Sequence, residues 1–286
     1  MRPEDWQRWA SRLGRLAVSY LERVPAHRGQ ARLVNSLGRV LGPVPLRSVG
    51  GVELLVRLDS VMDRSYVVRG RLSHAELLAE IGRLHPGAIV VDVGANAGLY
   101  TVLAAQAVTP SGRVFAFEPS ADEFARLAWA VAANGLPNVL ASNVALSDAA
   151  GFIGFIPGPS DHTGLHRLAA AADARSDAPS HVGARTVART VWAERGDVAV
   201  PLASGEQVAL LKVDVEGAEL SVLRGFQALL EARRVERLVV EITDEFLQRY
   251  GASASALYAY LAGFGYVPTK GPCPEWQYDE VFFLPS

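Results

Sequence analysis

Short hydrophobic runs alternate with helical segments over most of the chain beyond residue 85. The runs typical of buried strands are residues 89–93, 113–117, 139–144, 208–214 and 237–242. The helical segments between them begin near Gly98, Ala121, Ala218 and Ser253. This alternation predicts an α/β fold, in which a doubly wound, mostly parallel sheet carries helices on both faces.

The flanks of this region show other patterns. Two strand-like runs, 266–269 and 280–284, enclose the turn-forming sequence Gly271-Pro-Cys-Pro, which predicts an antiparallel C-terminal hairpin. Upstream, residues 52–58 alternate like a strand. Residues 73–84 have helical spacing, with Ser73 as the expected N-cap.

The first 40 residues carry hydrophobic side chains at helical spacing: Trp6, Trp9, Leu13, Leu16 and Tyr20. Pro25 is expected to divide them into two helices. Arginines between the hydrophobic positions could favour an acidic membrane surface or a partner, but helices that pack on the core are commoner. We expect a helical cap over residues 1–50 and a main domain over residues 51–286.

Composition narrows the class of protein. The 286 residues are 50% hydrophobic with a formal charge of −2, which excludes a disordered polymer and gives no sign of a nucleic-acid partner. The one cysteine, Cys273, cannot form an intramolecular disulfide, and no apolar run is long enough to span a membrane. We expect a cytoplasmic protein without a secretory signal. The oligomeric state stays open, with a homodimer among the alternatives.

The strand 89–93 leads into a turn that carries Gly94 and Gly98. Glycine lets a ligand approach the backbone closely. Because these glycines stand four apart, the G-x-G-x-x-G pattern of dinucleotide binders is missing, and a nicotinamide-dependent oxidoreductase is disfavoured. Asp92, at the strand end, suits a ligand with an ammonium group, such as S-adenosylmethionine.

Two further polar residues follow neighbouring strands. Glu118 comes a little over twenty residues after the turn, where a carboxylate can accept both ribose hydroxyls of a nucleoside. Asn143 comes at the end of the third strand. Two roles stay open for its side chain: contact with an adenine edge, or hydrogen bonds within the loop alone.

Four motifs together resemble the FkbM-type methyltransferase family, from about residue 54 onward. They are Asp92-Val-Gly-Ala-Asn-Ala-Gly, Ala116-Phe-Glu-Pro, Asn143-Val-Ala-Leu-Ser-Asp and Lys212-Val-Asp-Val-Glu-Gly-Ala-Glu. The resemblance implies a class I methyltransferase fold and S-adenosylmethionine as cofactor. It also implies methylation of an oxygen on a sugar, glycan or polyketide-type natural product.

By the same resemblance, Asp92, Gly94, Asn96 and Gly98 hold the methionine part of the cofactor and Glu118 binds the ribose. The chain departs from the family pattern between about residues 161 and 201, where Thr190-Val-Trp-Ala-Glu-Arg replaces the usual segment. Because of this departure, the resemblance does not identify the substrate.

Lys212 and Asp214 share one face of a predicted central strand, with Asp214 at its carboxyl end. They could act together on the acceptor. We favour the alternative that Lys212 is a buried cation neutralised by Asp214, Glu216 or Glu241, because an unpaired charge there would be costly. Asp214 and Glu216 then orient the acceptor or act as base, and we also count Asp214 among the cofactor contacts.

A hydroxyl acceptor needs a group that removes its proton. His162 and His166 lie in the aperiodic stretch from about 156 to 200, and His162 is our candidate base there. Beside Asp161 they also suggest a metal, but a firm helix and a third ligand are missing, so we predict no required metal.

Three other functions compete with O-methyl transfer. An oxidoreductase needs the missing glycine pattern. A nucleic-acid methyltransferase should show an Asn-Pro-Pro-Tyr-like turn or a basic aromatic patch, and the sequence has neither. The retained Asp92, Gly94, Glu118 and Asp214 argue against a non-catalytic binding module.

Overall fold

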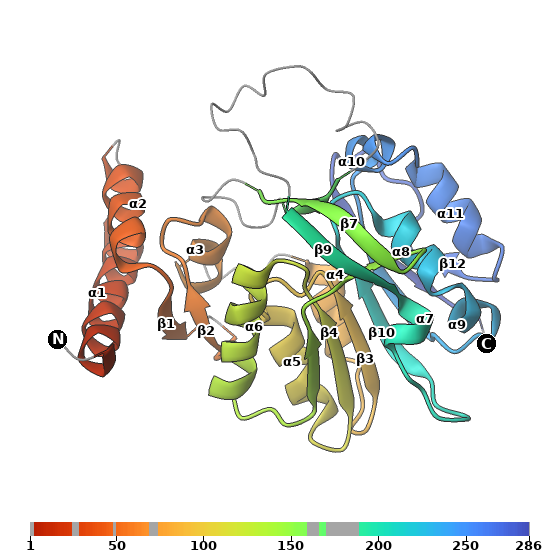
Figure 1. The fold of residues 1–286 in the computed structure, drawn as a ribbon, viewed down its shortest axis with the longest axis horizontal. Helices are drawn as coiled ribbons and strands as arrows, with labels where there is room; N and C mark the ends of the chain where they lie inside the picture. Colours follow the sequence, from red (N-terminus) through yellow and green to blue (C-terminus); the bar gives the residue numbers. More distant parts are fainter. Residues whose placement is uncertain are drawn as a thin grey trace.

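The computed structural model of the chain describes residues 3–24, 29–47, 50–68, 74–158, 166–169 and 189–285. Its centre is a sheet with the strand order β12-β13-β11-β10-β3-β4-β5 (Figure 1). These strands are β3 (Ile89–Val93), β4 (Arg113–Phe117), β5 (Val139–Ser142), β10 (Val208–Val213), β11 (Arg237–Ile242), β12 (Val267–Pro268) and β13 (Tyr278–Phe283).

Five neighbouring strands of this sheet, from β5 to β11, run parallel. β13 is antiparallel to both β11 and β12. The predicted doubly wound α/β fold with a C-terminal hairpin is therefore confirmed. The predicted strand 139–144 ends early, at Ser142, and the predicted strand 208–214 ends at Val213.

Alternate residues of each central strand pack into two different cores. Val90 and Leu210 join the core under the helices α4 (Ala75–Ile81) and α5 (Leu99–Val108). Val91 and Leu211 join the opposite core, under α8 (Glu219–Gly225), α9 (Gln227–Glu231) and α11 (Ala254–Ala262). Because successive side chains of a strand point to opposite faces and both faces are covered, these strands read as continuous hydrophobic runs.

The helix starts predicted near Gly98, Ala121, Ala218 and Ser253 agree with the structure to within a residue. Ser120 caps α6 (Ala121–Ala133) by accepting the N–H of Glu123, and Ser253 caps α11 by accepting the N–H of Ala256. At α4 the N-cap is His74, with a left-handed backbone, and the expected cap Ser73 lies outside the described residues.

The stretch from 156 to 200, which we expected to be irregular, is wrongly predicted in part. A second sheet has the order β6-β9-β7-β8. It consists of β6 (Ala145–Ser147), β7 (Gly151–Ile156), β8 (Arg167–Leu168) and β9 (Arg189–Arg195), and the short helix α7 (Gly196–Ala199) follows it. The chain leaves the central sheet after Ser142 and enters this sheet at Ala145, which is why the third strand is short.

The N-terminal helices are α1 (Pro3–Arg23) and α2 (Gln30–Leu41), on either side of Pro25 as predicted. In Figure 1 they lie at the left, beside the antiparallel pair β1 (Val44–Arg47) and β2 (Glu53–Val56). The expected domain boundary after residue 50 falls inside this hairpin. β1 was not predicted because it has four residues, too few to show a period.

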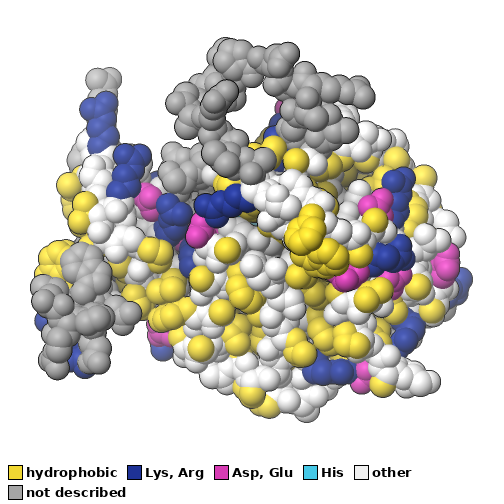
Figure 2. Space-filling view, in the orientation of Figure 1, with side chains coloured by type: hydrophobic (Ala, Val, Ile, Leu, Met, Phe, Trp, Pro, Cys, Tyr) yellow, Lys and Arg dark blue, Asp and Glu magenta, His cyan; other side chains and the backbone are white. Residues whose placement is uncertain are grey.

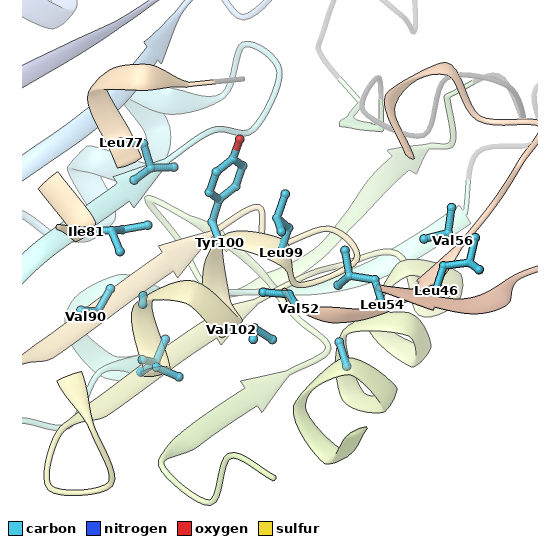
Figure 3. Packing of buried hydrophobic residues seen from close by; sticks show 14 of the residues in the cluster. Leu46, Val52, Leu54, Val56, Leu77, Ile81, Val90, Leu99, Tyr100 and Val102 are labelled. Atoms are coloured by element: carbon cyan, nitrogen blue, oxygen red, sulfur yellow. The ribbon is translucent and has the colours of Figure 1, made fainter. Parts of the chain in front are cut away.

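The N-terminal elements share a core with the main domain. Leu46 and Leu54 of the hairpin belong to one hydrophobic cluster with Leu99 and Val102 of α5 (Figure 3). The backbone of Glu53 exchanges two hydrogen bonds with the side chain of Asn134 after α6. The hairpin therefore packs on the main domain.

Basic and hydrophobic side chains lie together on the N-terminal arm at the left of Figure 2. Trp9, Leu16, Leu33 and Val40 are among its exposed hydrophobic residues. No helix in the described part of the chain is long and apolar enough to cross a membrane.

A buried ion cluster fastens α3 (Val61–Val68) to α6. The guanidinium of Arg126, 4% exposed, pairs with Asp63 and with Glu123, and its Nε donates to the carbonyl of Leu55 at 2.8 Å. Removing one member of such a cluster leaves the others charged and unpaired in the core.

We therefore expect Arg126→Met to lower the free energy of unfolding by about 3–5 kcal/mol. The matched control is Arg189→Met, because Arg189 makes an exposed ion pair with Asp122 and should contribute at most about 1 kcal/mol. Urea denaturation of both variants measures the difference. Equal midpoints would contradict the structural role given to the cluster.

Candidate active site

A cavity of about 640 Å³ opens at the carboxyl ends of the central strands. It lies where the strand order reverses, between β3 and β10, the usual ligand position in such sheets. Its size is within the range of small-molecule sites. Residues far apart in the chain, including Met62 and Asp279, complete its wall.

The turn after β3 forms one side of the cavity, and Gly94 and Asn96 line it. Gly94 has φ +78, and a Cβ there would lie 1.9 Å from the carbonyl oxygen of Asp214. The N–H groups of Gly94 and Ala95 both donate to the carbonyl of Phe117. Gly94 is thus required for close contact between β3 and β10, in addition to any approach of a ligand.

The second glycine of the turn has another role. Gly98 has φ +92, and a Cβ there would meet Leu127 of α6 at 2.8 Å. Gly98 does not line the cavity. Among the turn residues, the structure brings Gly94 and Asn96 to the cavity and places Gly98 behind it.

Glu118 lies across the turn, at the cavity wall, and is 5% exposed. Its two carboxylate oxygens accept the N–H groups of Asn96 at 2.9 Å and Ser120 at 2.8 Å, which fixes the orientation of the carboxyl group. Burial raises the pKa of Glu118 to about 7. Each oxygen keeps a lone pair for a further donor.

Asn143 lies outside the cavity lining and is exposed. Its amide donates to the carbonyls of Glu118 and Pro119 at 2.8 and 3.2 Å, so it holds the loop that carries Glu118. The predicted contact with adenine stays a prediction.

Lys212 is the buried cation at the centre of the site. Its Nζ lies 3.1 Å from Asp92 Oδ1 and 3.4 Å from Asp214 Oδ2, and donates to the carbonyl of Gly94 at 2.7 Å. Burial alone would lower the pKa of Lys212, but these two carboxylates outweigh it and raise the pKa. The favoured interpretation, a neutralised cation, agrees with the pairing to Asp214.

Asp92 was not foreseen as the second partner. The parallel register places Lys212 beside Asp92 on the neighbouring strand, and Thr101 also donates to this carboxylate at 2.5 Å. Asp92 is 2% exposed and is not among the residues that line the cavity. The negative charge of Asp92 is therefore paired with Lys212, and direct contact of Asp92 with a ligand ammonium stays a prediction.

Three more carboxyl groups gather at this end of the cavity. Burial, together with the nearby Asp214 and Glu219, raises the pKa of Glu216 to about 9. Burial also raises the pKa of Glu241 well above its usual value, and Asp214 adds to the effect. Glu219 accepts the N–H groups of Gly217 at 2.9 Å and Val215 at 3.2 Å, so it holds the loop before α8.

Asp214 behaves differently from its neighbours. Burial alone would raise its pKa, but Lys212 and His74 outweigh burial and lower it. Glu241 also shares a hydrogen bond with it. Asp214 is therefore an anion at neutral pH, while Glu216 holds a proton there.

His74 and Asp279 form a pair that sequence reasoning missed. His74 Nδ1 lies 2.9 and 3.0 Å from the two oxygens of Asp279, although 205 residues separate them. Burial alone would lower the pKa of His74, but Asp279 outweighs it and raises the pKa. The available signal was Asp279 itself, a charged residue within a run that forms a buried strand.

The predicted base His162, with Asp161, lies outside the described residues. His166 lines the cavity, but its Nδ1 accepts the N–H of Gly158 at 2.9 Å and its Nε2 lies 3.8 Å from Glu123. These two contacts hold the side chain of His166 in the cavity wall.

Two overlapping groups of side chains have ligand atoms within 4.8 Å of one another: His74, Glu241 and Asp279, and Asp214, Glu216 and Glu241. They are the residues in the described part of the chain that could hold a cation. Their present partners are within the protein, since Gln277 donates to Glu241 at 2.6 Å and His74 bonds Asp279. The expectation of no required metal stays a prediction.

We expect Lys212→Met to lower the free energy of unfolding by about 3–5 kcal/mol, because Asp92 and Asp214 lose their shared cation. The chain offers a matched control in Lys270→Met, since Lys270 makes an exposed ion pair with Glu76 and should cost about 1 kcal/mol or less. Chemical denaturation measures both variants.

The deficit of Lys212→Met should also depend on pH. Carboxyl groups buried without a cation bind protons more readily in the folded than in the unfolded chain, so their penalty is absent at low pH and grows as the pH rises. The deficit should therefore be smaller at pH 5 than at pH 8. A deficit no larger than that of Lys270→Met at both values would contradict the proposed pairing.

Comparison with known proteins agrees with this geometry. A model of the methyltransferase FkbM domain matches residues 92–268. The hexuronic acid methyltransferase AglP of Haloferax volcanii is 28% identical over 207 residues, which cover 72% of this chain and 73% of that protein. The 31-O-demethyl-FK506 methyltransferase FkbM of Streptomyces tacrolimicus is 30% identical over 215 residues, which cover 64% and 74%.

Among solved structures, the METTL16 methyltransferase domain aligns with 92% of this chain and 83% of its own, at a TM-score of 0.49 and 13% identity. The family match spans more than half of the chain and includes the turn after β3, Glu118 and the whole Lys212 motif. It confirms the resemblance drawn from those motifs and the class I methyltransferase fold. The chain belongs to the FkbM methyltransferase family.

Proposed function

We propose that this methyltransferase uses S-adenosylmethionine to methylate a hydroxyl oxygen of a sugar, glycan or natural-product acceptor. The observation that carries the proposal is one cavity with unlike residues at its two ends, on either side of β3. Glu118, after β4, and the turn at Asn96 line one end, and Lys212, Asp214 and Glu216, on or after β10, line the other. Two substrates can therefore meet inside it.

The residues at the first end suit an adenosyl cofactor. Glu118 presents a fixed, nearly buried carboxylate that can accept two ribose hydroxyls. The glycine turn lets the rest of the ligand lie against backbone. When bound, S-adenosylmethionine supplies a methyl group that is already activated by its sulfonium charge, so the protein mainly has to align the acceptor and exclude water.

The residues at the second end suit a hydroxyl-bearing group. Asp214 is an anion at neutral pH, and the protonated Glu216 can donate as well as accept hydrogen bonds. The names of the two relatives support this class of acceptor, since one acts on hexuronic acid and the other on an oxygen of demethyl-FK506.

The first test is calorimetric titration with S-adenosylhomocysteine, with NADH as the control ligand. We expect Glu118→Gln to weaken binding about 10- to 100-fold, since a hydrogen bond to a charged group contributes about 1.5–3 kcal/mol. The exposed Glu236→Gln should bind like the wild type. Binding of NADH in place of S-adenosylhomocysteine would overturn the assignment.

The affinity for S-adenosylhomocysteine should rise with pH. Because the pKa of Glu118 is about 7, its ionised fraction grows as the pH passes that value, and the ionised carboxylate accepts ribose hydroxyls better. We expect up to about tenfold tighter binding at pH 8 than at pH 6. Titrations at both values measure it, and Glu118→Gln should lose the pH dependence while Glu236→Gln keeps it.

The acceptor test uses radiolabelled S-adenosylmethionine and three probes: a methyl hexuronide, a neutral methyl hexoside and a macrolide with a free hydroxyl. We expect label to enter the hydroxyl oxygen of at least one probe, as located by NMR of the product. Transfer to none of the three, with S-adenosylhomocysteine binding intact, would contradict the proposed acceptor class without affecting the cofactor assignment.

A further inference from the structure

One side chain of the cavity wall is held as a catalytic base would be. His74 lies directly before α4 and lines the cavity, with φ +66 and ψ +62, a conformation that residues other than glycine rarely adopt. Strained residues of this kind cluster at functional sites, where surrounding contacts hold them in place.

The surrounding contacts of His74 come from distant parts of the chain. Asp279, on β13, has both carboxylate oxygens within hydrogen-bond distance of Nδ1, and its side chain is 6% exposed. The ring of Tyr100, on α5, meets the imidazole edge to face with centroids 5.5 Å apart. The imidazole therefore has one orientation, with Nδ1 directed at Asp279.

Among the described residues, Asp279 is the hydrogen-bond partner of His74, and it occupies Nδ1 alone. The second nitrogen, Nε2, is left for a ligand, and His74 lines the cavity at its acceptor end with Asp214 and Glu241. A carboxylate on Nδ1 favours the neutral tautomer whose proton is on that nitrogen, which leaves a lone pair on Nε2.

The other titratable groups at this end are poorly suited to removing a proton. Lys212 is paired with two carboxylates and stays charged. Asp214 already compensates that cation, so its affinity for a proton is low. Glu216 holds a proton at neutral pH and cannot accept another. His74, in contrast, lines the cavity and has no hydrogen-bond partner on Nε2 among the described residues, so its neutral ring can accept a proton there.

We propose that His74 is the catalytic base of this methyltransferase and that Asp279 is the residue that positions it. The inference rests on the proposed function, because a base is required only if the acceptor atom carries a proton to lose. In the reaction, the acceptor oxygen bonds to the methyl carbon while the carbon–sulfur bond breaks and its electron pair stays on sulfur. The hydroxyl proton passes to Nε2 of His74, and the imidazolium later returns it to water.

Several titratable and charged groups face the imidazole and set the pH at which it can act. Asp279 faces it from β13, and Asp214 and Lys212 face it from β10. Glu241 comes from β11, and Glu76 lies on α4, paired with Lys270. Carboxylates outnumber Lys212 around the ring, and the pKa of His74 is raised, so the base form prevails only above the usual range for histidine.

The state of His74 can be measured without an acceptor. In protein labelled with ¹⁵N at histidine and saturated with S-adenosylhomocysteine, two-bond ¹H–¹⁵N correlations distinguish the tautomers, and His74→Gln identifies the His74 signals. We expect the neutral ring to carry its proton on Nδ1. Asp279→Asn should move the His74 titration to lower pH, whereas the exposed Asp122→Asn should leave it unchanged.

The role of His74 is measured with the hydroxyl acceptor that the wild-type protein methylates. We expect His74→Gln to lower kcat by a factor of roughly 10² to 10⁴ with binding of S-adenosylhomocysteine unchanged, while the exposed His85→Gln keeps full activity. For wild type, kcat should rise with pH through the His74 titration. Asp279→Asn should lower the plateau and move that limb to lower pH, which a merely structural role would not do.

The outcomes separate this inference from the proposed function. A neutral His74 with its proton on Nε2, or a titration that ignores Asp279→Asn, overturns the inference even if hydroxyl methylation is found. A His74→Gln variant with wild-type kcat also overturns it. Failure of the wild type to methylate any hydroxyl overturns the proposed function, and the base role with it, while the S-adenosylhomocysteine titration still reports on the cofactor site.

Discussion

The site depends on one constraint: the ammonium group of Lys212 is buried in a central strand and must be neutralised. Asp92 on the neighbouring strand and Asp214 at the end of the same strand supply the charge, and the carbonyl of Gly94 accepts a further hydrogen bond. A buried charge without such partners would cost more than most single interactions contribute. The turn after β3 and the loop after β10 are therefore locked together, and the room for this contact exists only because residue 94 lacks a side chain.

The acidic residues of the site have different partners and different roles. Asp92 and Asp214 pair with Lys212, Glu118 is fixed by two backbone N–H groups, and Glu219 holds the loop before α8. Burial raises the pKa of Glu216 to about 9 and that of Glu241 well above its usual value, which favours their uncharged forms. The cavity is thus less negative than its composition suggests, which suits a hydroxyl-bearing acceptor next to a positively charged methyl donor.

The sequence predicted features that depend on local patterns and missed those that depend on contacts between residues far apart in the chain. The strands β3, β4 and β11 were predicted to the residue, because burial on both faces of a parallel sheet leaves a continuous hydrophobic run. The second sheet was missed, because β6 and β9 lie far apart in the chain and neither shows a clear period. The pairing of Lys212 with Asp92 depends on strand register, and that of His74 with Asp279 on the closing of the whole fold. Neither pairing leaves a local signal that identifies the partner.

The His74–Asp279 pair lies outside the segment that the family model matches. The family match covers residues 92–268, which hold the glycine turn, Glu118 and the Lys212 cluster. His74 precedes the matched region and Asp279 follows it, and other residues of the acceptor wall, such as Met62 and Trp276, also lie outside. The proposed acceptor wall therefore combines the matched core, which supplies Asp214 and Glu216, with the flanking segments, which supply His74 and Asp279. In these flanks, the hydrophobic packing of the N-terminal hairpin and α4 sets the position of His74.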